Sequence, residues 1–234
     1  MKAIIKKELC IYFNTPIAWV FLSVMMCVSG IFFTLFNLFE ANSSVSVIFS
    51  LLPWVFVVMI PLLTMRLVAE ERSLKTDQLL LTAPISVSSI VWGKLFAALI
   101  VFMLSTVLML IFPVILEFYS DVEWGVVVTN YLGFFLLGAA LMSVGLFISS
   151  LTENQFTAAI ITIAVLIAMF LLSGLDQSSG VVIVDKLLSI IGILKRYDSF
   201  FIGIVNIPDA LYYISITLVF ALFTIYRIEK RRIR

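Results

Sequence analysis

A short polar stretch between two long apolar segments carries a dense group of residues capable of ionic chemistry. Six charged side chains gather within residues 66–77: Arg66, Glu70, Glu71, Arg72, Lys75 and Asp77. The stretch contains no Gly, and its Pro stands only at its end, which predicts a helix exposed to water. Arg66 with Glu70, and Glu71 with Lys75, are spaced as i,i+4 ion pairs. Such a helix suits ion pairing with a protein partner, and a solvated charged loop is the alternative interpretation.

The remaining composition excludes most catalytic chemistry. The chain has no His, which removes every catalytic or zinc scheme that depends on imidazole. Cys10 and Cys27 both lie in apolar stretches, where a thiol behaves as a small hydrophobe. The Gly93-Lys94 pair lacks the earlier glycine and the following Ser or Thr of a P-loop. We therefore expect no catalytic, cofactor-binding or metal site, and a net charge of +1 disfavours a nucleic-acid partner.

The elements that position the polar stretch must cross a membrane. The chain of 234 residues is 63% hydrophobic and only 12% charged, whereas soluble proteins carry about 25% charged residues. Six intervals, of 17 to 31 residues, contain no charged residue: 9–39, 41–65, 95–116, 124–152, 154–175 and 210–226. A helix needs roughly 20 residues to cross the hydrocarbon layer. The sequence therefore predicts an all-α, polytopic membrane protein with six transmembrane helices.

The distribution of basic residues orients these spans. With the N-terminus inside, the cytoplasmic segments hold 12 Lys and Arg residues, and the outer segments hold only Lys186, Lys195 and Arg196. Cytoplasmic segments carry the excess of basic residues in membrane proteins. We expect a multi-pass protein of the bacterial cytoplasmic (inner) membrane with both termini in the cytoplasm.

The first 14 residues have the pattern of a helix that lies on the membrane. Ile5, Leu9, Tyr12 and Phe13 share one helical face, and the nearby lysines lie mostly away from it. Pro16 then separates this segment from the first span. The pattern predicts an interfacial elbow helix over residues 1–14, with a basic flank that merely orients the span as the alternative.

Two further segments outside the spans are candidates for function. Thr152 and Gln155 are spaced as a capping box, which predicts that the fifth span begins there, and a simple tight turn is the alternative. Residues 176–209 are too apolar for an ordinary loop, but their charges leave no full span. Short re-entrant helices at the outer end fit this pattern, as a gate or as a lid.

The spans themselves favour packing over ion transport. Small residues at Ala139 and Ser143, and at Gly145 and Ser149, form i,i+4 surfaces for close helix contact. No Asp, Glu, Lys, Arg or His lies at the centre of any predicted span. The chain therefore lacks the usual machinery of an ion-coupled transporter. An amphiphilic or lipid-like cargo is favoured over a small ion.

The polar stretch and its flanks resemble a known family. The residues that carry the resemblance in this segment are Ala69, Glu70, Glu71, Arg72, Thr76, Leu80, Leu81, Pro84, Ile85, Ile90, Val91, Gly93 and Lys94. It resembles the first cytoplasmic segment of ABC-2-type permeases, the membrane subunits of type V ABC exporters. Residues 1–17 and the turn 149–155 resemble more closely the permease associated with gliding motility. The similarity extends over nearly the whole chain and implies a single ABC-2-type transmembrane domain over residues 1–234.

The resemblance implies roles for the polar segments. Residues 69–82 would be the coupling helix that docks a separate ABC ATPase, through Arg66, Glu70, Glu71, Arg72, Leu74, Lys75, Thr76 and Gln78. The turn with Thr152, Glu153, Asn154 and Gln155 would be a second cytoplasmic contact, and 176–209 the outer helices. Relatives often have Gly immediately before the threonine and Glu two residues after it. Here those positions are Lys75 and Gln78.

The function that follows is that of a non-enzymatic permease subunit of an ATP-driven exporter. Two copies of the ATPase would bind ATP and Mg, and a second permease, identical or related, would complete the transporter in the lipid bilayer. The alternative is a membrane anchor for an ATPase in a motility or envelope-assembly complex without solute transport. A membrane-embedded enzyme would need polar residues that converge at one depth, and the sequence shows no such cluster.

Overall fold

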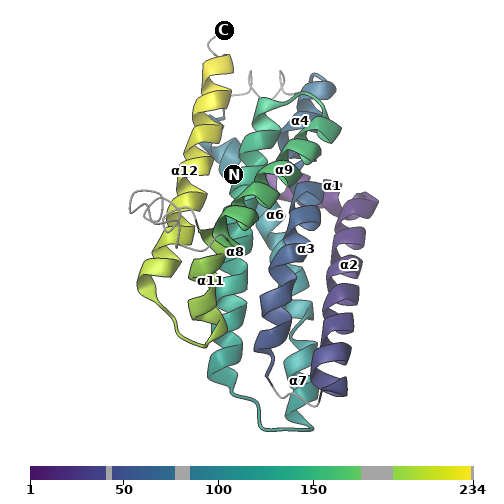
Figure 1. The fold of residues 1–234 in the computed structure, drawn as a ribbon. Coiled ribbons are helices and arrows are strands. Elements are labelled where there is room, and N and C mark those ends of the chain that lie inside the picture. The colour runs from purple at the N-terminus through teal and green to yellow at the C-terminus, as the bar shows by residue number, and fades with distance from the viewer. Residues whose placement is uncertain (41–43, 77–84, 175–191, 233–234) are drawn as a thin grey trace.

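The computed structural model describes residues 1–40, 44–76, 85–174 and 192–232, and all regular structure in these ranges is helical (Figure 1). In chain order the helices are α1 (Lys2–Asn14), α2 (Pro16–Phe32), the π-helical η1 (Phe33–Phe39), α3 (Ser46–Thr64), α4 (Arg66–Ser73), α6 (Val87–Leu108), α7 (Ile111–Glu117), α8 (Trp124–Leu151), α9 (Gln155–Gly174), α11 (Ile193–Phe201) and α12 (Ile207–Arg232). The long helices lie side by side in an upright bundle (Figure 1). The all-α prediction is confirmed.

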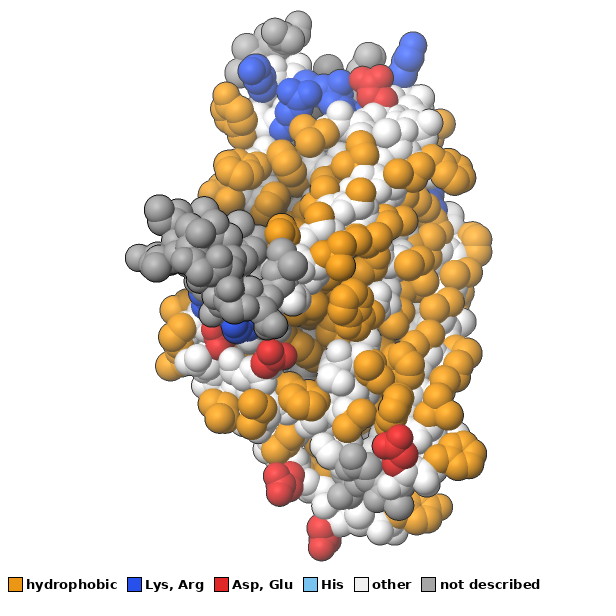
Figure 2. Space-filling model, viewed as in Figure 1, with side chains coloured by type: hydrophobic (Ala, Val, Ile, Leu, Met, Phe, Trp, Pro, Cys, Tyr) orange, Lys and Arg blue, Asp and Glu red, His pale blue; other side chains and the backbone are white. Residues whose placement is uncertain are grey.

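Six helical stretches of the described chain are long and apolar enough to cross a membrane. They are Pro16–Phe39, Ser46–Ser73, Val87–Glu117, Trp124–Leu151, Gln155–Gly174 and Ile207–Arg231. Each includes most or all of one charge-free interval, so the prediction of six spans is confirmed. Large apolar side chains cover the middle of the visible face, while Lys and Arg gather at one end (Figure 2). This outward-facing apolar surface suits a protein whose solvent is lipid.

Two buried hydroxyls within the spans bond to their own helices. The hydroxyl of Ser29 donates to the Met25 carbonyl at 2.7 Å, and that of Thr162 donates to the Ala158 carbonyl at 2.7 Å. A hydroxyl that bonds four residues back satisfies itself without a partner helix. These residues therefore tolerate an apolar environment, where an unsatisfied polar group is costly.

Helix α8 forms the centre of the bundle. It packs against α3, α6, α9, α11 and α12, and of the spans it is the most buried, whereas the last span is the least buried. Its Phe134 contacts three buried aromatic rings, Phe49 and Phe56 of α3 and Phe102 of α6, at centroid separations of 4.7 to 5.5 Å. Tilted and edge-to-face ring pairs of this kind stabilise a core beyond the area that they bury.

The third span is interrupted at a position that its proline explains. Helix α6 ends at Leu108 and α7 begins at Ile111, with Pro113 inside α7. Pro113 has no N–H to donate to the carbonyl of Met109, four residues earlier. The amide of Phe112 bonds to that carbonyl instead, at 3.1 Å. The missing bond accounts for the short break between the two helices.

The predicted outer segment lies partly in the described chain. Helix α11 falls within residues 176–209 and is too short to span, which agrees with the expectation of short helices there; residues 176–191 lie outside the described residues. Tyr197 of α11 donates to the Phe49 carbonyl at 3.1 Å, and Tyr213 of α12 donates to the Ile193 carbonyl at 2.7 Å. These bonds fasten α11 to α3 and α12. A re-entrant position in the membrane stays a prediction.

The predicted small-residue surface on α8 makes a close helix contact. A Cβ atom added at Gly145 would lie 2.3 Å from Oγ1 of Thr64, at the end of α3. One turn further on, the Ser149 hydroxyl accepts from the amides of Val68 and Ala69 and donates to the carbonyl of Met65. Ser149 thus caps the junction between α3 and α4. The two small residues position α4 against the bundle.

The contact at Gly145 predicts a specific loss of stability. Gly145→Ala places a methyl group within the Thr64 side chain, and we expect a destabilisation of about 1–3 kcal/mol from overpacking. Gly125→Ala is the matched control, because nothing lies within 4 Å of its added Cβ atom. Thermal unfolding of the purified variants in detergent measures both. Equal melting temperatures for the two variants would contradict the close packing of α8 on α3.

Candidate functional site

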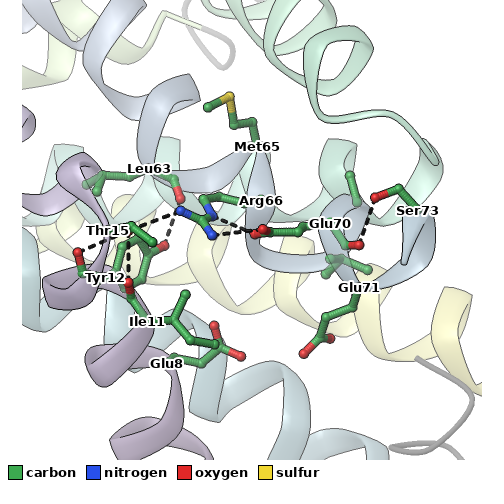
Figure 3. Close-up of polar contacts among 12 residues, drawn as sticks. Glu8, Ile11, Tyr12, Thr15, Leu63, Met65, Arg66, Glu70, Glu71 and Ser73 are labelled. Carbon is green, nitrogen blue, oxygen red and sulfur yellow. Dashed lines mark hydrogen bonds and ion pairs between the residues drawn. The ribbon is translucent and has the colours of Figure 1, made fainter. Parts of the chain in front are cut away.

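The polar stretch folds against the N-terminal helix at one end of the bundle. Helix α1 buries Ile4, Glu8 and Tyr12, which are spaced by four residues and so share one face. The predicted apolar residues Ile5, Leu9 and Phe13 flank this face and are partly buried against the core. The centre of the face therefore carries a carboxylate that the sequence pattern did not single out. In Figure 3, Glu8 of α1 and Glu71 of α4 point toward one another across the gap between these helices.

Four charged side chains from three helices close a ring in this gap. The Lys94 ammonium of α6 lies 2.8 Å from Glu8 and 2.8 Å from Glu71. Lys7 of α1 lies 2.6 Å from Glu71 and 3.7 Å from Glu8. The charges alternate in sign around the ring and sum to zero. We call Lys7, Glu8, Glu71 and Lys94 the charge ring.

The burial of the ring sets its energetics. The side chain of Lys94 is only 2% exposed, and those of Glu8 and Glu71 are 7% and 14% exposed. An ammonium removed from water at this depth is stable only if anionic partners replace its hydration. Both carboxylates also pair with Lys94, so removing Lys94 leaves two buried carboxylates with only the half-exposed Lys7. Lys94 is therefore the member on which the ring depends most, unlike a residue of an exposed ion pair, whose contribution is small.

Gly93 allows the backbone of α6 to approach α1. A Cβ atom at this position would lie 2.9 Å from a methyl carbon of Ile4. The close approach brings Lys94 within reach of Glu8, 86 residues apart in sequence. The charge-free intervals left Lys94 in the flank before the third span. In the structure α6 begins at Val87, so Lys94 lies within the helix that continues into this span.

Burial and neighbouring charges act in opposite directions on Lys7. Burial lowers the pKa of its ammonium, but the hydrogen bond to Glu71 and the charges of Glu71 and Glu8 outweigh this and raise the pKa above 10.5. The stability that this amine contributes is thus fully present below its ordinary pKa and is lost as the pH rises through the raised value. Lys7 is consequently cationic at neutral pH.

A second set of bonds ties the start of α4 to the elbow between α1 and α2 (Figure 3). Arg66 forms the predicted i,i+4 pair with Glu70 in a bidentate geometry, at 2.5 and 2.8 Å. It also donates to Thr15 at 3.1 Å, and the Tyr12 hydroxyl donates to the Leu63 carbonyl at 2.7 Å. Burial raises the pKa of Tyr12, so the phenol remains a donor. A cleft of about 320 Å³ lies between α1 and α4, and Arg66 and the charge ring are among its lining residues.

The polar helix ends earlier than the sequence predicted. Helix α4 ends at Ser73, Leu74–Thr76 form a turn, and the expected continuation to residue 82 lies outside the described residues, with Gln78. The amide of Thr76 bonds to the Glu71 carbonyl and that of Lys75 to the Arg72 carbonyl. These two bonds are those of a Schellman motif, which ends a helix. The predicted helical pair of Glu71 with Lys75 is therefore wrong, and Glu71 belongs to the charge ring.

Lys75 occupies the left-handed position of this motif, with φ +57°. Glycine suits that position because a Cβ atom in the left-handed region meets the following carbonyl oxygen. The glycine that relatives of the resembled family often have before the threonine falls on this residue. Where relatives often have Gly, this chain therefore holds Lys75 in a backbone conformation that favours glycine.

The turn between α8 and α9 joins the same end of the bundle. Arg72 is buried, and its guanidinium donates to the Thr152 carbonyl at 3.0 Å. Glu153 pairs with Arg231 near the end of α12 at 3.0 Å. The structure thus brings the two predicted contact segments together, at α4 and at residues 152–155.

The predicted capping box in this turn is wrong. Thr152 is the extended C-cap of α8, and its hydroxyl bonds back to Ile148. Asn154 caps α9 instead, because its side-chain oxygen accepts from the Phe156 amide at 2.9 Å. Helix α9 begins at Gln155, which is too late in the chain for Thr152 to cap it.

The predicted docking residues divide into two groups by exposure. Arg66, Glu70, Glu71 and Arg72 bond to other parts of this chain and are partly or fully buried. Those open to solvent are Leu74, Lys75, Thr76, Glu153 and Asn154. Among the described residues, no three His, Cys, Asp or Glu side chains gather to hold a metal ion. The chemistry available at this end is ion pairing and surface contact.

Fold and site together define a multi-pass membrane protein with a short charged helix between its second and third spans. Residues 33–226 match the family model described as ABC-2 family transporter protein. The match covers most of the chain, and the protein belongs to this family, whose members are membrane subunits of ABC transporters and associate in general with an ABC ATPase. Comparison with curated proteins gives no match. The resemblance to ABC-2-type permeases is confirmed, and the link to gliding motility stays a prediction.

The charge ring predicts that two substitutions are less harmful together than one alone. Lys94→Met leaves Glu8 and Glu71 with only Lys7 as a counter-ion, and we expect a loss of roughly 3 kcal/mol. Adding Glu8→Gln restores charge balance, because Lys7 and Glu71 remain a pair. Thermal unfolding of both variants measures the difference. A double variant that is less stable than Lys94→Met would contradict the mutual dependence of these charges.

The left-handed residue predicts a stabilising substitution. Lys75→Gly removes the steric cost of φ +57°, and we expect a gain of about 1 kcal/mol. Lys75→Val should lose stability, because a β-branched side chain fits this region poorly. The melting temperatures of the two variants test the turn. If Lys75→Val were as stable as Lys75→Gly, the helix would not end here.

Proposed function

We propose that this protein is the transmembrane permease of an ATP-driven exporter and that it couples ATP hydrolysis in a separate ATPase subunit to outward movement of cargo. The observation that carries the proposal is the geometry of α4. Its charged residues are fixed to α1, α6 and the turn after α8, while the turn that follows α4 exposes Leu74, Lys75 and Thr76. A segment that is anchored on one side and open on the other is suited to a partner subunit.

The charge distribution supports a cytoplasmic position for this end. The exposed lysines of α1 and the basic end of α12 belong to the same side as α4, and the visible face shows Lys and Arg gathered there (Figure 2). The two turns at the opposite end, with the last residue of α7, carry only acidic charges among their described residues: Glu40, Glu117, Asp121 and Glu123. Basic residues favour the cytoplasmic side. We therefore infer that both termini and the candidate site face the cytoplasm of a bacterial inner-membrane protein.

The ATPase docking surface consists of the exposed residues Leu74, Lys75, Thr76, Glu153 and Asn154. Leu74 is 65% exposed, so it offers a partner subunit an apolar contact beside the polar residues of the same turn. Arg72 holds this turn beside Thr152. The two contact segments would therefore meet the ATPase as one surface. Arg66, Glu70, Glu71 and Arg72 would position it without direct contact.

The complete transporter would contain two permeases, identical or related, and two ATPases that bind ATP and Mg. Binding and closure of the ATPases would move α4 as a rigid element, and the permease itself would perform no covalent chemistry. The lipid-facing apolar spans favour an amphiphilic cargo over a small ion. A membrane anchor without transport activity would use the same docking surface, and transport by the reconstituted complex separates the two functions.

The exposed leucine gives the sharpest test of docking. Leu74→Asp places a charge at the proposed contact, and we expect at least a tenfold loss of co-purification with the ATPase encoded nearby, equivalent to about 1.4 kcal/mol of binding free energy. Tyr119→Asp is the control. Tyr119 is 80% exposed, but it lies at the opposite end of the bundle, so its complex should remain intact.

Two results would decide against the docking proposal. One is retention of the ATPase by Leu74→Asp at the level of the unchanged protein. The other is failure of the unchanged protein to purify with any ATPase in mild detergent. Equal loss in the Tyr119→Asp control would trace the effect to general destabilisation.

A further inference from the structure

The connection between α4 and its neighbours has two parts of different kinds. Helix α4 packs chiefly on α3, α8 and α9. Its ion pairs with α1 and α6 are formed by the long side chain of Glu71, which reaches Lys7 and Lys94, and Arg66 adds a hydrogen bond to Thr15 at the end of α1. Helices α1 and α6, in contrast, pack directly on each other around Gly93. Glu71 is therefore the residue of α4 that forms ion pairs with both of these helices.

We propose that Lys94 is the positioning residue that joins α4 to span α6, so that movement of α4 is passed into the membrane. The inference rests on the proposed function, since the ATPase would supply the movement. Lys94 is buried and cannot touch a partner subunit. It acts through Glu71, and the two helices move together because their charges cannot part at this depth.

The physical basis is the cost of separation rather than the strength of attraction alone. If α4 moved away from α6, Lys94 would keep Glu8 but lose one of its two anions, and Glu71 would keep only Lys7. In a poorly hydrated environment water does not readily replace these bonds. An exposed ion pair would break and re-form in water at little cost. Because Lys94 is so little exposed, its bond to Glu71 holds α4 and α6 together rigidly.

The pairs of helices that each ion pair connects distinguish the role of Lys94 from that of the other ring residues. Lys7 and Glu71 connect α1 to α4 at 2.6 Å without Lys94. Glu8 and Lys94 connect α1 to α6, where the helices already pack closely. Only the bond between Glu71 and Lys94 links α4 directly to α6 within the ring. Replacing Glu8 alone therefore leaves the joint, whereas replacing Lys94 removes it.

The test measures the movement of α6 in the complex with the ATPase. Spin labels at Ser88→Cys and Thr157→Cys report the distance between the exposed starts of α6 and α9. The background carries Cys10→Ala and Cys27→Ala, because both native thiols are exposed. Distances are recorded by pulsed electron paramagnetic resonance without nucleotide and after trapping with Mg-ATP and vanadate. We expect a nucleotide-dependent shift with native Lys94, of the order of 2 Å or more.

Two variants distinguish the bond between Glu71 and Lys94 from the other contacts of the charge ring. Lys94→Met/Glu8→Gln keeps the ring neutral, and we expect it to bind the ATPase but to lose the nucleotide-dependent shift. Glu8→Gln alone retains the bond between Glu71 and Lys94 and should keep the shift. Co-purification in the same samples reports on docking independently of this movement.

Three outcomes would overturn the role of Lys94 while leaving ATPase docking intact. The first is a shift of native size in Lys94→Met/Glu8→Gln. The second is loss of the shift in Glu8→Gln, and the third is no shift with native Lys94. If the ATPase does not bind the protein with native Lys94, the proposed function fails instead.

Discussion

A buried ammonium requires negative charge within hydrogen-bonding distance, and this requirement fixes one end of the molecule. Lys94 obtains its two anions from different helices, Glu8 of α1 and Glu71 of α4. Both helices must therefore stay beside α6, and Lys7 completes the balance of charge. The close approach of α6 to α1 at Gly93 and the hydrogen bonds of Arg66 and Arg72 hold the same end of the bundle together. The exposed turn after α4 owes its position to these contacts.

The fold could be predicted because lipid imposes a simple rule on sequence. Charged residues are excluded from the apolar layer, so the intervals between them mark the spans, and an apolar solvent requires helices. The small residues Gly145 and Ser149 likewise indicated a close contact, which the structure places against Thr64 and the start of α4. The pair of Arg66 with Glu70 was predictable because its partners lie four residues apart on one helix.

The charge ring could not be predicted from local pattern. Glu8 stands among lysines and looks like part of a basic flank, and its partner Lys94 is 86 residues away. The sequence held one weak indication that Glu8 is buried, since Ile4, Glu8 and Tyr12 share a helical face. The end of α4 depended on Lys75 adopting a conformation that favours glycine. The bond of Arg72 could not be predicted either, because its carbonyl partner at Thr152 belongs to a distant turn.

We propose that the charge ring holds α4 so that the exposed turn after it meets the ATPase. The most direct measurement is an electron cryomicroscopy structure of the permease bound to its ATPase. We expect ATPase density against Leu74–Thr76 and Glu153–Asn154, with Lys94 still between Glu8 and Glu71. An ATPase bound elsewhere, or one that contacts Glu71 directly in place of Lys94, would contradict it.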